Sequence, residues 1–309
     1  MELSMPTIKR LLLAVSMCCL VATANAAPID DADAAYNRGD YAQAIKIWRS
    51  LAAQGNADAQ IVLGVMYHSG ERVPQDYQEA VKWWKLAAAQ GVVQAQFNLG
   101  KMYEDGLGVT QDYKEAVKWY RLAADQGDAY AQSNLGGRYK NGLGVTQDYK
   151  EAVKWFRLAA AQRSVEAQYN LGMMYYEGQG VIRDYKEAVK WFRLAAAQGA
   201  TPAQSNLGKM YYEGQGVTQD YKEAVKWLRL AADQGDTIAQ YNLGVMYAKG
   251  QGVIQDYANA HMWFNLAADQ GDADGAKNRD VTAQRMTPQQ IEKAQDMARA
   301  CQARNFKGC

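Results

Sequence analysis

Residues 199–234 read GATPAQSNLGKMYYEGQGVTQDYKEAVKWLRLAADQ, and the pattern of this stretch decides the fold of the chain. Its first half has helical periodicity from Pro202 to Glu213. The pattern stops at Gly214, the first residue of a Gly-rich segment, and glycine permits the positive φ that a sharp chain reversal needs. The first half therefore predicts one helix followed by a turn.

The second half of the stretch predicts another helix. It begins at Asp220, a favourable N-cap residue, and Glu223 follows three positions later as in a variant of the capping box. It ends near Gly235, because glycine commonly terminates helices. The stretch as a whole therefore predicts two helices that a Gly-rich turn joins.

Landmarks of this stretch recur along the chain at a fixed interval of 36 residues, which is the signature of stacked structural repeats. We therefore expect an all-α fold, a right-handed α-solenoid of antiparallel helix pairs, with six repeats over residues 55–270. The dipeptide Asp-Tyr begins at positions 40, 76, 112, 148, 184, 220 and 256, and Leu-Gly begins at 63, 99, 135, 171, 207 and 243.

The two ends of the array depart from the repeat, as expected of a solenoid whose end faces need covering. Residues 27–54 contain a shorter version of the pattern, which predicts a helix pair that caps the N-terminal end. Residues 271–309 lose the pattern and predict C-terminal capping helices. The last of these begins at Thr287, with Pro288 at its first helical position.

Residues 1–26 have the pattern of a cleavable secretory signal peptide. Lys9 and Arg10 precede an apolar run, and the tripeptide at 24–26 has the small-x-small form of a cleavage site. We therefore expect a periplasmic or secreted protein. In that oxidising compartment the two cysteines that remain after cleavage, Cys301 and Cys309, are expected to form a disulfide at the C-terminus.

Charge and composition exclude several classes of partner. The chain has 34 basic and 33 acidic residues and so lacks the positive excess that neutralises a phosphate backbone. We therefore expect no nucleic-acid partner. The one long apolar run lies in the signal peptide and is shorter than the roughly 20 residues that span a bilayer, so no membrane insertion is expected. His68 and His261 lie far from each other and from the cysteines, so we expect neither a metal nor another cofactor.

The repeated pattern AQ-x-NLG-x-MY-x-x-G-x-GV-x-x-DY-x-x-A-x-x-W-x-x-LAA-x-QG resembles the Sel-1-like repeat family, a relative of the tetratricopeptide repeats. The resemblance extends over residues 27–272. It implies an adaptor scaffold, and exported bacterial members of the family are implicated in host interaction or envelope assembly. A cysteine-rich subset associated with penicillin-type compounds carries a disulfide in each repeat. No repeat of this chain contains a cysteine, so the resemblance does not imply that activity.

The segment DYKEAVKW mixes acidic and basic residues, but its repetition argues against catalysis. An active site needs one converging set of groups, whereas these groups recur at regular and separated positions. Each has a role in a helix: Asp112 caps it, and Glu115 lies three residues before Lys118. No nucleophile motif accompanies either histidine, so we expect no enzyme. The segment occurs letter for letter at 112–119, 148–155, 184–191 and 220–227.

Tryptophan and glycine positions indicate close packing of helices. A Trp that stands in register in every repeat is expected to pack between repeats and not to bind a ligand. The glycine of each Leu-Gly, as at Gly64 and Gly100, costs about 1 kcal/mol in a helix relative to Ala, so we expect two helices to approach closely there. The Trp residues stand in two columns, one of Trp83, Trp119, Trp155, Trp191, Trp227 and Trp263 and one of Trp48 and Trp84.

The positions at which the repeats differ are the candidates for function. Three columns of the first helix, spaced i, i+4 and i+7, vary most and fall within roughly a 60° arc. Because packing between like repeats requires sameness, this arc is expected to point away from neighbouring helices and to line the concave surface. The columns read Ile61, Val65, His68; Phe97, Lys101, Glu104; Ser133, Gly137, Lys140; Tyr169, Met173, Tyr176; Ser205, Lys209, Tyr212; and Tyr241, Val245, Ala248.

Large side chains and bordering lysines in these columns form the predicted partner-binding surface, centred on residues 163–248. An alternative is that the aromatic rings pack across the groove against one another or against the terminal caps. The predicted residues are Phe97, Lys101, Lys140, Tyr169, Met173, Tyr176, Lys209, Tyr212 and Tyr241.

These observations predict a protein-interaction scaffold of the cell envelope or a secreted one, which binds a protein or peptide segment in its concave groove. One alternative is an envelope enzyme that acts on peptidoglycan or a β-lactam, or a glycan-binding module. Another is a structural spacer that assembles with itself. The identity of the partner and the oligomeric state are left open.

Overall fold

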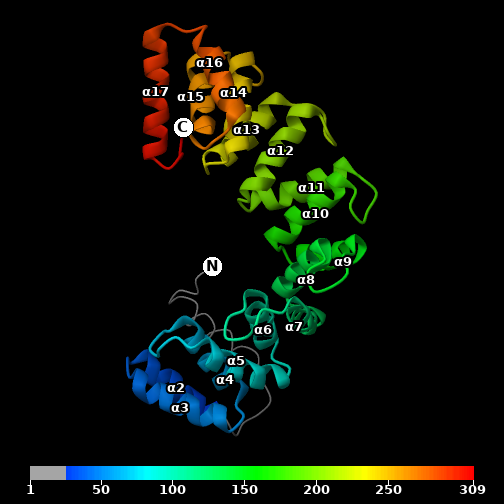
Figure 1. Cartoon of the computed structure of the whole chain (residues 1–309), viewed down its shortest axis with the longest axis vertical. Helices are drawn as coiled ribbons and strands as arrows, with labels where there is room; N and C mark the ends of the chain where they lie inside the picture. Colours follow the sequence, from blue (N-terminus) through cyan, green and yellow to red (C-terminus); the bar gives the residue numbers. More distant parts are fainter. Residues whose placement is uncertain (1–25) are drawn as a thin grey trace. The chain divides into compact units, whose positions relative to one another are not determined.

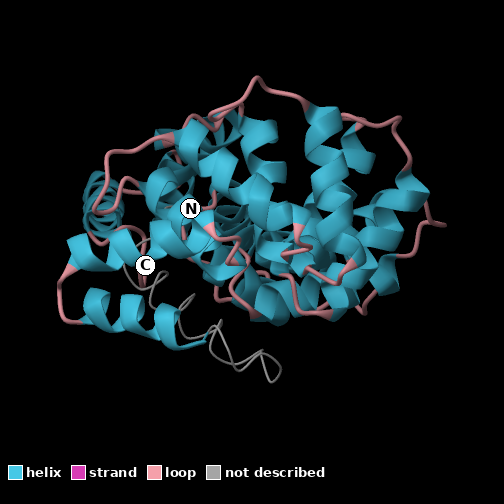
Figure 2. Cartoon of the chain, turned by 90° about the horizontal axis from the view of Figure 1, so that it is seen from below, coloured by secondary structure: helices cyan, strands magenta, loops and turns pink. Residues whose placement is uncertain are grey.

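The computed structural model describes residues 26–309, so the predicted signal peptide lies outside the described residues except for its last position. Sixteen helices account for the regular structure of residues 26–309, and none of these residues forms a strand (Figure 2). The chain divides into two compact units, one ending at Asp148 and the other comprising Tyr149–Cys309. Figure 1 labels their helices. The predicted all-α class with paired helices is confirmed, and the right-handed sense of the solenoid stays a prediction.

The described part of the first unit holds seven helices, in which each consecutive pair packs together. They are α2 (Ala26–Asn37), α3 (Tyr41–Ala53), α4 (Ala57–Ser69), α5 (Tyr77–Ala89), α6 (Val93–Asp105), α7 (Tyr113–Asp125) and α8 (Ala129–Asn141). The second unit continues the alternation with nine more. They are α9 (Tyr149–Ala161), α10 (Val165–Glu177), α11 (Tyr185–Ala197), α12 (Thr201–Glu213), α13 (Tyr221–Ala232), α14 (Thr237–Lys249), α15 (Tyr257–Asp269), α16 (Ala273–Ala283) and α17 (Pro288–Ala303).

The second helix of a repeat begins at its Asp N-cap, as predicted. In α13 one carboxylate oxygen of Asp220 accepts hydrogen bonds from the amides of Lys222 and Glu223, at 2.9 and 3.1 Å. The expected role of Glu223 in a capping box is wrong, because its carboxylate pairs instead with Lys226 at 3.1 Å. A reciprocal capping box does form at the start of α17, between Thr287 and its N3 residue.

The turn between paired helices needs glycine for two different reasons. Gly214 ends α12 in the left-handed region with a φ of 71°, which side chains disfavour. Gly216 has a φ of 70°, and a Cβ there would lie only 2.2 Å from the carbonyl oxygen of Tyr185 in the preceding repeat. The turn therefore packs tightly against the neighbouring second helix.

The glycine inside each first helix makes room for a large side chain of the second helix, as predicted. A Cβ on Gly100 would lie 2.5 Å from the ring of Tyr120, and one on Gly172 would lie 2.7 Å from the ring of Phe192. These rings belong to a fully buried column of the second helices. The column holds Trp84, Tyr120, Phe156, Phe192, Leu228 and Phe264.

The expectation that the main Trp column fills the space between repeats is therefore only partly right. Trp155 and Trp263 are buried, but the other members of that column are only half-buried. The next residue along the helix faces the first-helix glycine, and one residue is a rotation of about 100°, which turns the Trp toward the helix flank.

Buried glutamines connect successive helices along the array. The Gln96 amide donates to the carbonyl of Ala88 at 3.4 Å, and its oxygen accepts from the amide of Gln126 at 2.8 Å. The two partners lie eight residues before Gln96 and thirty residues after it. Gln60, Gln168 and Gln204 make the same two bonds.

The C-terminal segment closes the second unit. Helix α17 packs against α15 (Figure 1), and Ala298 and Cys301 join Trp263 and Leu266 in one buried cluster. Cys301 and Cys309 form a disulfide with a Cα–Cα distance of 5.4 Å, in agreement with the sequence prediction. Helices α16 and α17 lie within residues 271–309, and their role as a C-terminal cap stays a prediction.

Candidate partner-binding site

The predicted site residues are divided between the two units. Phe97, Lys101 and Lys140 lie on α6 and α8 of the first unit, and the other six lie on α10, α12 and α14 of the second. Lys209 is exposed and the remaining eight are half-buried. The variable arc is thus not a uniformly free face, and in α4 its members Ile61 and Val65 are fully buried, contrary to expectation.

The aromatic rings of this arc pack on the second helix of their own repeat. The ring centroids of Tyr169 and Phe192 are 5.9 Å apart, and those of Tyr176 and Tyr185 are 5.3 Å apart. This arrangement differs from both readings of the sequence, since the rings are neither free nor packed across a groove. Burial raises the pKa of Tyr169, an effect that a hydrogen bond with Asn206 opposes.

One ring pair recurs between the first arc column and the buried column of the second helix. It joins Phe97 to Tyr120 at 5.9 Å, Tyr169 to Phe192 at 5.9 Å and Tyr241 to Phe264 at 5.7 Å. The repeat at 201–236 lacks both rings, because it has Ser205 and Leu228 at these positions. The Ser205 hydroxyl instead hydrogen bonds with the Asp236 carboxylate at 3.0 Å.

A pocket of about 250 Å³ lies beside Leu228, one of the two positions of the missing ring pair, and Ser205 does not line it. Leu228, which is fully buried, forms part of its wall, and the first helices α12 and α14 supply the other lining residues. The pocket brings together three of the predicted site residues. Its lining consists of Lys209, Tyr212, Glu213, Leu228, Ile238, Tyr241 and Asn242.

Some polar groups of this pocket already have hydrogen-bond or ion-pair partners within the described part of the chain, and others do not. Tyr212 donates to Gln251 at 3.2 Å, and the Tyr241 hydroxyl accepts from Asn278 at 3.1 Å. Lys209 lies 3.9 Å from Glu213, a loose and exposed ion pair of little strength. The Asn242 amide has no hydrogen-bond partner within residues 26–309. The pocket therefore offers an apolar wall, one cation and one amide that can both donate and accept.

A second, smaller pocket lies beside α14, among α14, α15 and α16. Its volume is about 210 Å³, and its walls include Val245 and Ala248 from the two other variable columns of α14. Phe264 and Asn278, which contact Tyr241, also line it. The first-helix face of the second unit thus carries two neighbouring hollows, and Tyr241 stands between them.

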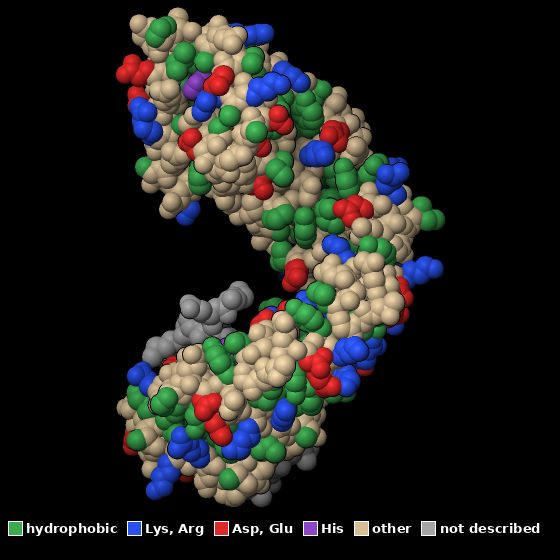
Figure 3. Space-filling model, in the orientation of Figure 1, with side chains coloured by type: hydrophobic (Ala, Val, Ile, Leu, Met, Phe, Trp, Pro, Cys, Tyr) green, Lys and Arg blue, Asp and Glu red, His purple; other side chains and the backbone are tan. Residues whose placement is uncertain are grey.

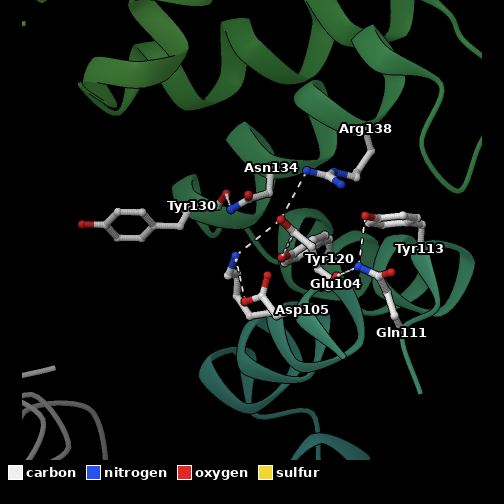
Figure 4. Close-up of polar contacts among 9 residues, drawn as sticks. Glu104, Asp105, Gln111, Tyr113, Tyr120, Tyr130, Asn134 and Arg138 are labelled. Atoms are coloured by element: carbon white, nitrogen blue, oxygen red, sulfur yellow. Dashed lines mark hydrogen bonds and ion pairs between the residues drawn. The ribbon is translucent and has the colours of Figure 1, made fainter. Parts of the chain in front are cut away.

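The first unit carries a polar cluster on the same arc (Figure 4). Glu104 accepts from the Tyr120 hydroxyl at 2.5 Å and pairs with Arg138 at 3.3 Å and Lys101 at 3.4 Å. Lys101 also lies 3.4 Å from Asp105. The sequence predicted that Lys101 borders an apolar surface. In the structure it is already paired with two carboxylates.

Burial and the adjacent Glu104 carboxylate raise the pKa of Tyr120, so this tyrosine stays protonated and donates. Arg138 takes the position that a buried methionine holds in each of the other repeats of residues 55–270. The cluster thus ties α6 to α8 by polar contacts. The sequence carried a signal for Arg138, since LGGRY is the one departure from the repeated LG-x-MY. Nothing in the sequence identified Glu104 as the partner of Arg138.

Leu228, Ile238, Glu213 and Asn242 were also missed in the sequence. The signal for Leu228 was that it is the one non-aromatic residue in its column. Ile238 is 62% exposed at the edge of the pocket, a position at which the sequence offers no contrast with ordinary surface residues. Lys140 lies at the end of α8, and its carbonyl accepts a hydrogen bond from Gln147 at 2.8 Å.

Other classes of site find no support in the described part of the chain. Within residues 26–309 no group of three or more His, Cys, Asp or Glu side chains is arranged to hold a metal ion. No helix in that range has the length and hydrophobicity to cross a bilayer. On the face drawn in Figure 3, basic and acidic side chains are interspersed over each unit.

Comparisons with known proteins agree with the repeat architecture. A family model described as Sel1 repeat matches most of the chain, including part of the predicted N-terminal cap. The matched segments are residues 33–56, 57–92, 93–128, 129–164, 165–199, 201–236 and 237–272. A comparison with curated proteins finds no match.

Two solved structures are similar over most of the chain. One is c5321, a protective antigen present in uropathogenic Escherichia coli strains that displays an SLR fold. It is 35% identical with a TM-score of 0.68, and the match covers 96% of this chain and 71% of that one. The other is a Sel1 repeat protein from Oxalobacter formigenes, 34% identical with a TM-score of 0.67, and the match covers 79% of this chain and 97% of that one.

Proposed function

The chain belongs to the Sel1 repeat family, whose members are generally protein-interaction scaffolds, and we propose that it binds a peptide segment at the pocket between α12 and α14. The Sel1 fold is typically a non-catalytic scaffold, so the proposed activity is binding and not turnover. The single observation that carries the proposal is the pocket beside Leu228, the one residue of its column that is not aromatic. It supports one defined pocket in place of the broad groove that the sequence predicted.

The chemistry of the pocket favours an aromatic or large aliphatic anchor on the partner. Such a side chain takes the place of the absent rings and contacts Leu228, Ile238 and Tyr241. A large aromatic buries about 150–250 Å², which contributes several kcal/mol before the cost of ordering is subtracted. Anchors of this kind dominate the energetics of protein interfaces.

Two polar groups support recognition of a peptide backbone and charge beside that anchor. The Asn242 carboxamide can donate to a backbone carbonyl and accept from a backbone amide. Lys209 is held only loosely by Glu213, so it is available to an acidic residue of the partner. We therefore expect a partner segment with an aromatic residue next to an acidic one.

A blocking variant tests the proposal. In Ser205→Tyr/Leu228→Phe the ring pair of the neighbouring repeats is restored, and we expect it to fill the pocket. Peptides selected from a displayed library against the mature protein are expected to contain an aromatic anchor. In calorimetric titrations the blocking variant is expected to weaken their binding by about tenfold or more, which is about 1.4 kcal/mol.

The control is Ser205→Thr/Leu228→Met, which adds one methyl group at 205, nearly keeps the side-chain volume at 228 and introduces no ring, so it is expected to leave the pocket open. It is expected to bind like the wild-type protein, and both variants are expected to keep the helical circular dichroism signal. Selected peptides that bind the blocking variant as well as the wild type would place the site elsewhere. Muropeptides in the same titration test the glycan-binding alternative, and a chromogenic β-lactam tests the hydrolase alternative.

We also propose that the protein acts in the cell envelope or is secreted. The signal-like pattern of residues 1–26 and the disulfide between Cys301 and Cys309 support this location, because disulfides persist in oxidising compartments. Fractionation of cells that express the full chain, with mass spectrometry of its N-terminus, tests it. Protein that stays in the cytoplasm with an intact N-terminus contradicts the proposal.

A further inference from the structure

A row of exposed leucines follows the second helices of the repeats, away from the pocket between the first helices. In the second unit Leu158 and Leu194 are each 45% exposed, and Leu230 is 43% exposed. They hold the same position in the successive second helices α9, α11 and α13. We call these three residues the leucine ridge.

The last repeat shows the same position in a covered state. Leu266 of α15 is the equivalent of the ridge leucines, and it is fully buried. It shares a buried cluster with Ala298 and Cys301 of α17, while Met297 packs against that cluster. An amphipathic helix with a face of small residues therefore covers this position where the chain supplies one.

The covered helix differs from the uncovered ones in charge. In α11, Lys190 and Arg193 flank the ridge, and Lys190 pairs with Glu187 at 3.2 Å. In α15 the positions of these two cations hold Met262 and Asn265. Helices α9 and α11 each contain three cationic residues and one carboxylate, so the uncovered ridge has a positive border.

We propose that the leucine ridge binds an amphipathic helix of a partner protein, with small residues on its buried face and acidic residues on its flanks. The ridge continues, repeat by repeat, the surface that α17 covers on α15. Acidic flanks complement the exposed Lys154 and Lys190, for which α15 has no counterpart. Arg157 and Arg193 add positive charge beside them, and each donates a hydrogen bond to a tyrosine hydroxyl of the next first helix, at 2.5 and 2.7 Å. The leucine ridge shares no residue with the pocket between α12 and α14.

The equivalent position in the first unit shows a hollow beside the leucine. Leu86 of α5 lines a pocket of about 530 Å³ together with Val81, Lys82, Lys85 and the turn at Gly108-Val109. A leucine, an apolar turn and two lysines thus surround a space that a helix side chain can enter. The same combination of apolar centre and basic border is what the ridge presents in the second unit.

The probe is a synthetic peptide based on the sequence of α17. It carries residues 287–303 with Lys293→Glu, Arg299→Glu and Cys301→Ala, and it is stapled on its polar face because a free helix of this length is marginal in water. A second peptide carries Glu292→Lys, Asp296→Lys and Cys301→Ala. We expect the acidic peptide to bind the mature protein about tenfold tighter than the basic one by fluorescence anisotropy, and to weaken with salt.

The ridge is tested with Leu158→Ser/Leu194→Ser, which is expected to weaken binding of the acidic peptide by about fivefold or more. The control is Ile182→Ser/Ile254→Ser, which removes two loop-tip side chains that are each 90% exposed in the same unit. The control is expected to bind unchanged. The ridge variant is expected to keep its binding at the first-helix pocket, which separates this inference from the proposed function.

Three results overturn the inference. They are an acidic peptide that fails to saturate at millimolar protein, equal binding of the acidic and basic peptides, and unchanged binding by the ridge variant. Light scattering distinguishes a further occupant. A wild-type dimer that becomes a monomer in the ridge variant assigns the ridge to a second copy of this chain and not to a partner helix.

Discussion

Two glycines inside the first helices, Gly100 and Gly137, differ in whether another side chain lies close to them. Replacing each with alanine separates the effect of a close contact on stability from the effect of helix propensity. Gly100 faces the buried ring of Tyr120, whereas a Cβ on Gly137 would have nothing within 4 Å. Both are helical, so replacement by alanine favours the backbone equally at the two positions. The difference between the two variants therefore isolates the contact.

We expect Gly100→Ala to destabilise the protein by about 1–3 kcal/mol, because the ring of Tyr120 must move. Gly137→Ala is expected to stabilise it by about 0.5–1 kcal/mol through helix propensity alone. The midpoint of urea unfolding, followed by circular dichroism, measures both. A gain in stability for both variants contradicts the close-approach explanation.

The buried His261 is expected to make the second unit sensitive to acid. Burial lowers the pKa of His261, and the nearby Arg279 lowers it further, while Asp280 opposes the shift. The unfolded chain therefore binds a proton at this residue more readily than the folded chain does. Stability is lost as the pH falls below the ordinary histidine value of 6.5, and it is fully present above that value.

The valine at the equivalent position of the other repeats, as at Val189 and Val225, supplies the test. We expect the wild-type Tm to fall between pH 7.5 and pH 5.5, and His261→Val to reduce that fall, because valine binds no proton. Differential scanning calorimetry at the two pH values measures it. An unchanged pH dependence in the variant shows that other groups, such as His68, cause the loss.

At the scale of helices, the sequence predicted the elements almost completely. The paired helices, the Asp caps and the Gly-rich turns were predictable because backbone requirements are local and each feature recurs in several repeats. The packing of the Trp column was harder to predict. Adjacent positions of a helix differ by about 100°, and periodicity alone does not say which of them faces the partner helix.

The disulfide joins α17 to the C-terminal tail, whose Phe306 and Cys309 pack against the cluster that contains Leu266, and it is predicted to support α17 over α15 through that tail. We expect Cys301→Ser/Cys309→Ser to lower the free energy of unfolding of the second unit by about 2–3 kcal/mol, since the bridge restrains a short loop. Hydrogen exchange is expected to speed up in α17 and at the end of α15 that contains Leu266. Reduction of the wild-type protein should reproduce both effects. Unchanged exchange in α17 shows that packing alone holds this helix.

At the scale of the whole chain, each repeat is expected to depend only on its neighbours. Removal of residues 200–235 joins Gly199 to Asp236 and restores the local sequence found between other repeats. We expect this variant to fold, with a helical signal reduced in proportion to the two helices lost. It is expected to lose binding of the selected peptides, because α12 and Leu228 are gone. A variant that unfolds contradicts the nearest-neighbour description.

The candidate site was only partly predictable. The variable columns led to Lys209, Tyr212 and Tyr241, which do line the pocket. The sequence did not show that most aromatic rings of those columns pack on a ring of their own repeat. Such a contact depends on one column of the first helix and one column of the second helix together. The pocket lies beside Leu228, in the one repeat that has no aromatic ring at either position of the pair. Such a paired substitution is recognised only when the contact between the two columns is known.

The buried glutamines constrain how a chain of this kind changes length over generations. Gln96 is bonded to a residue eight positions before it and to another thirty positions after it. Duplication or loss of a whole repeat preserves both intervals, whereas gain or loss of one residue between the partners displaces a buried amide from its hydrogen bond. We therefore expect relatives of this chain to differ in length by whole repeats, with the 36-residue period unchanged.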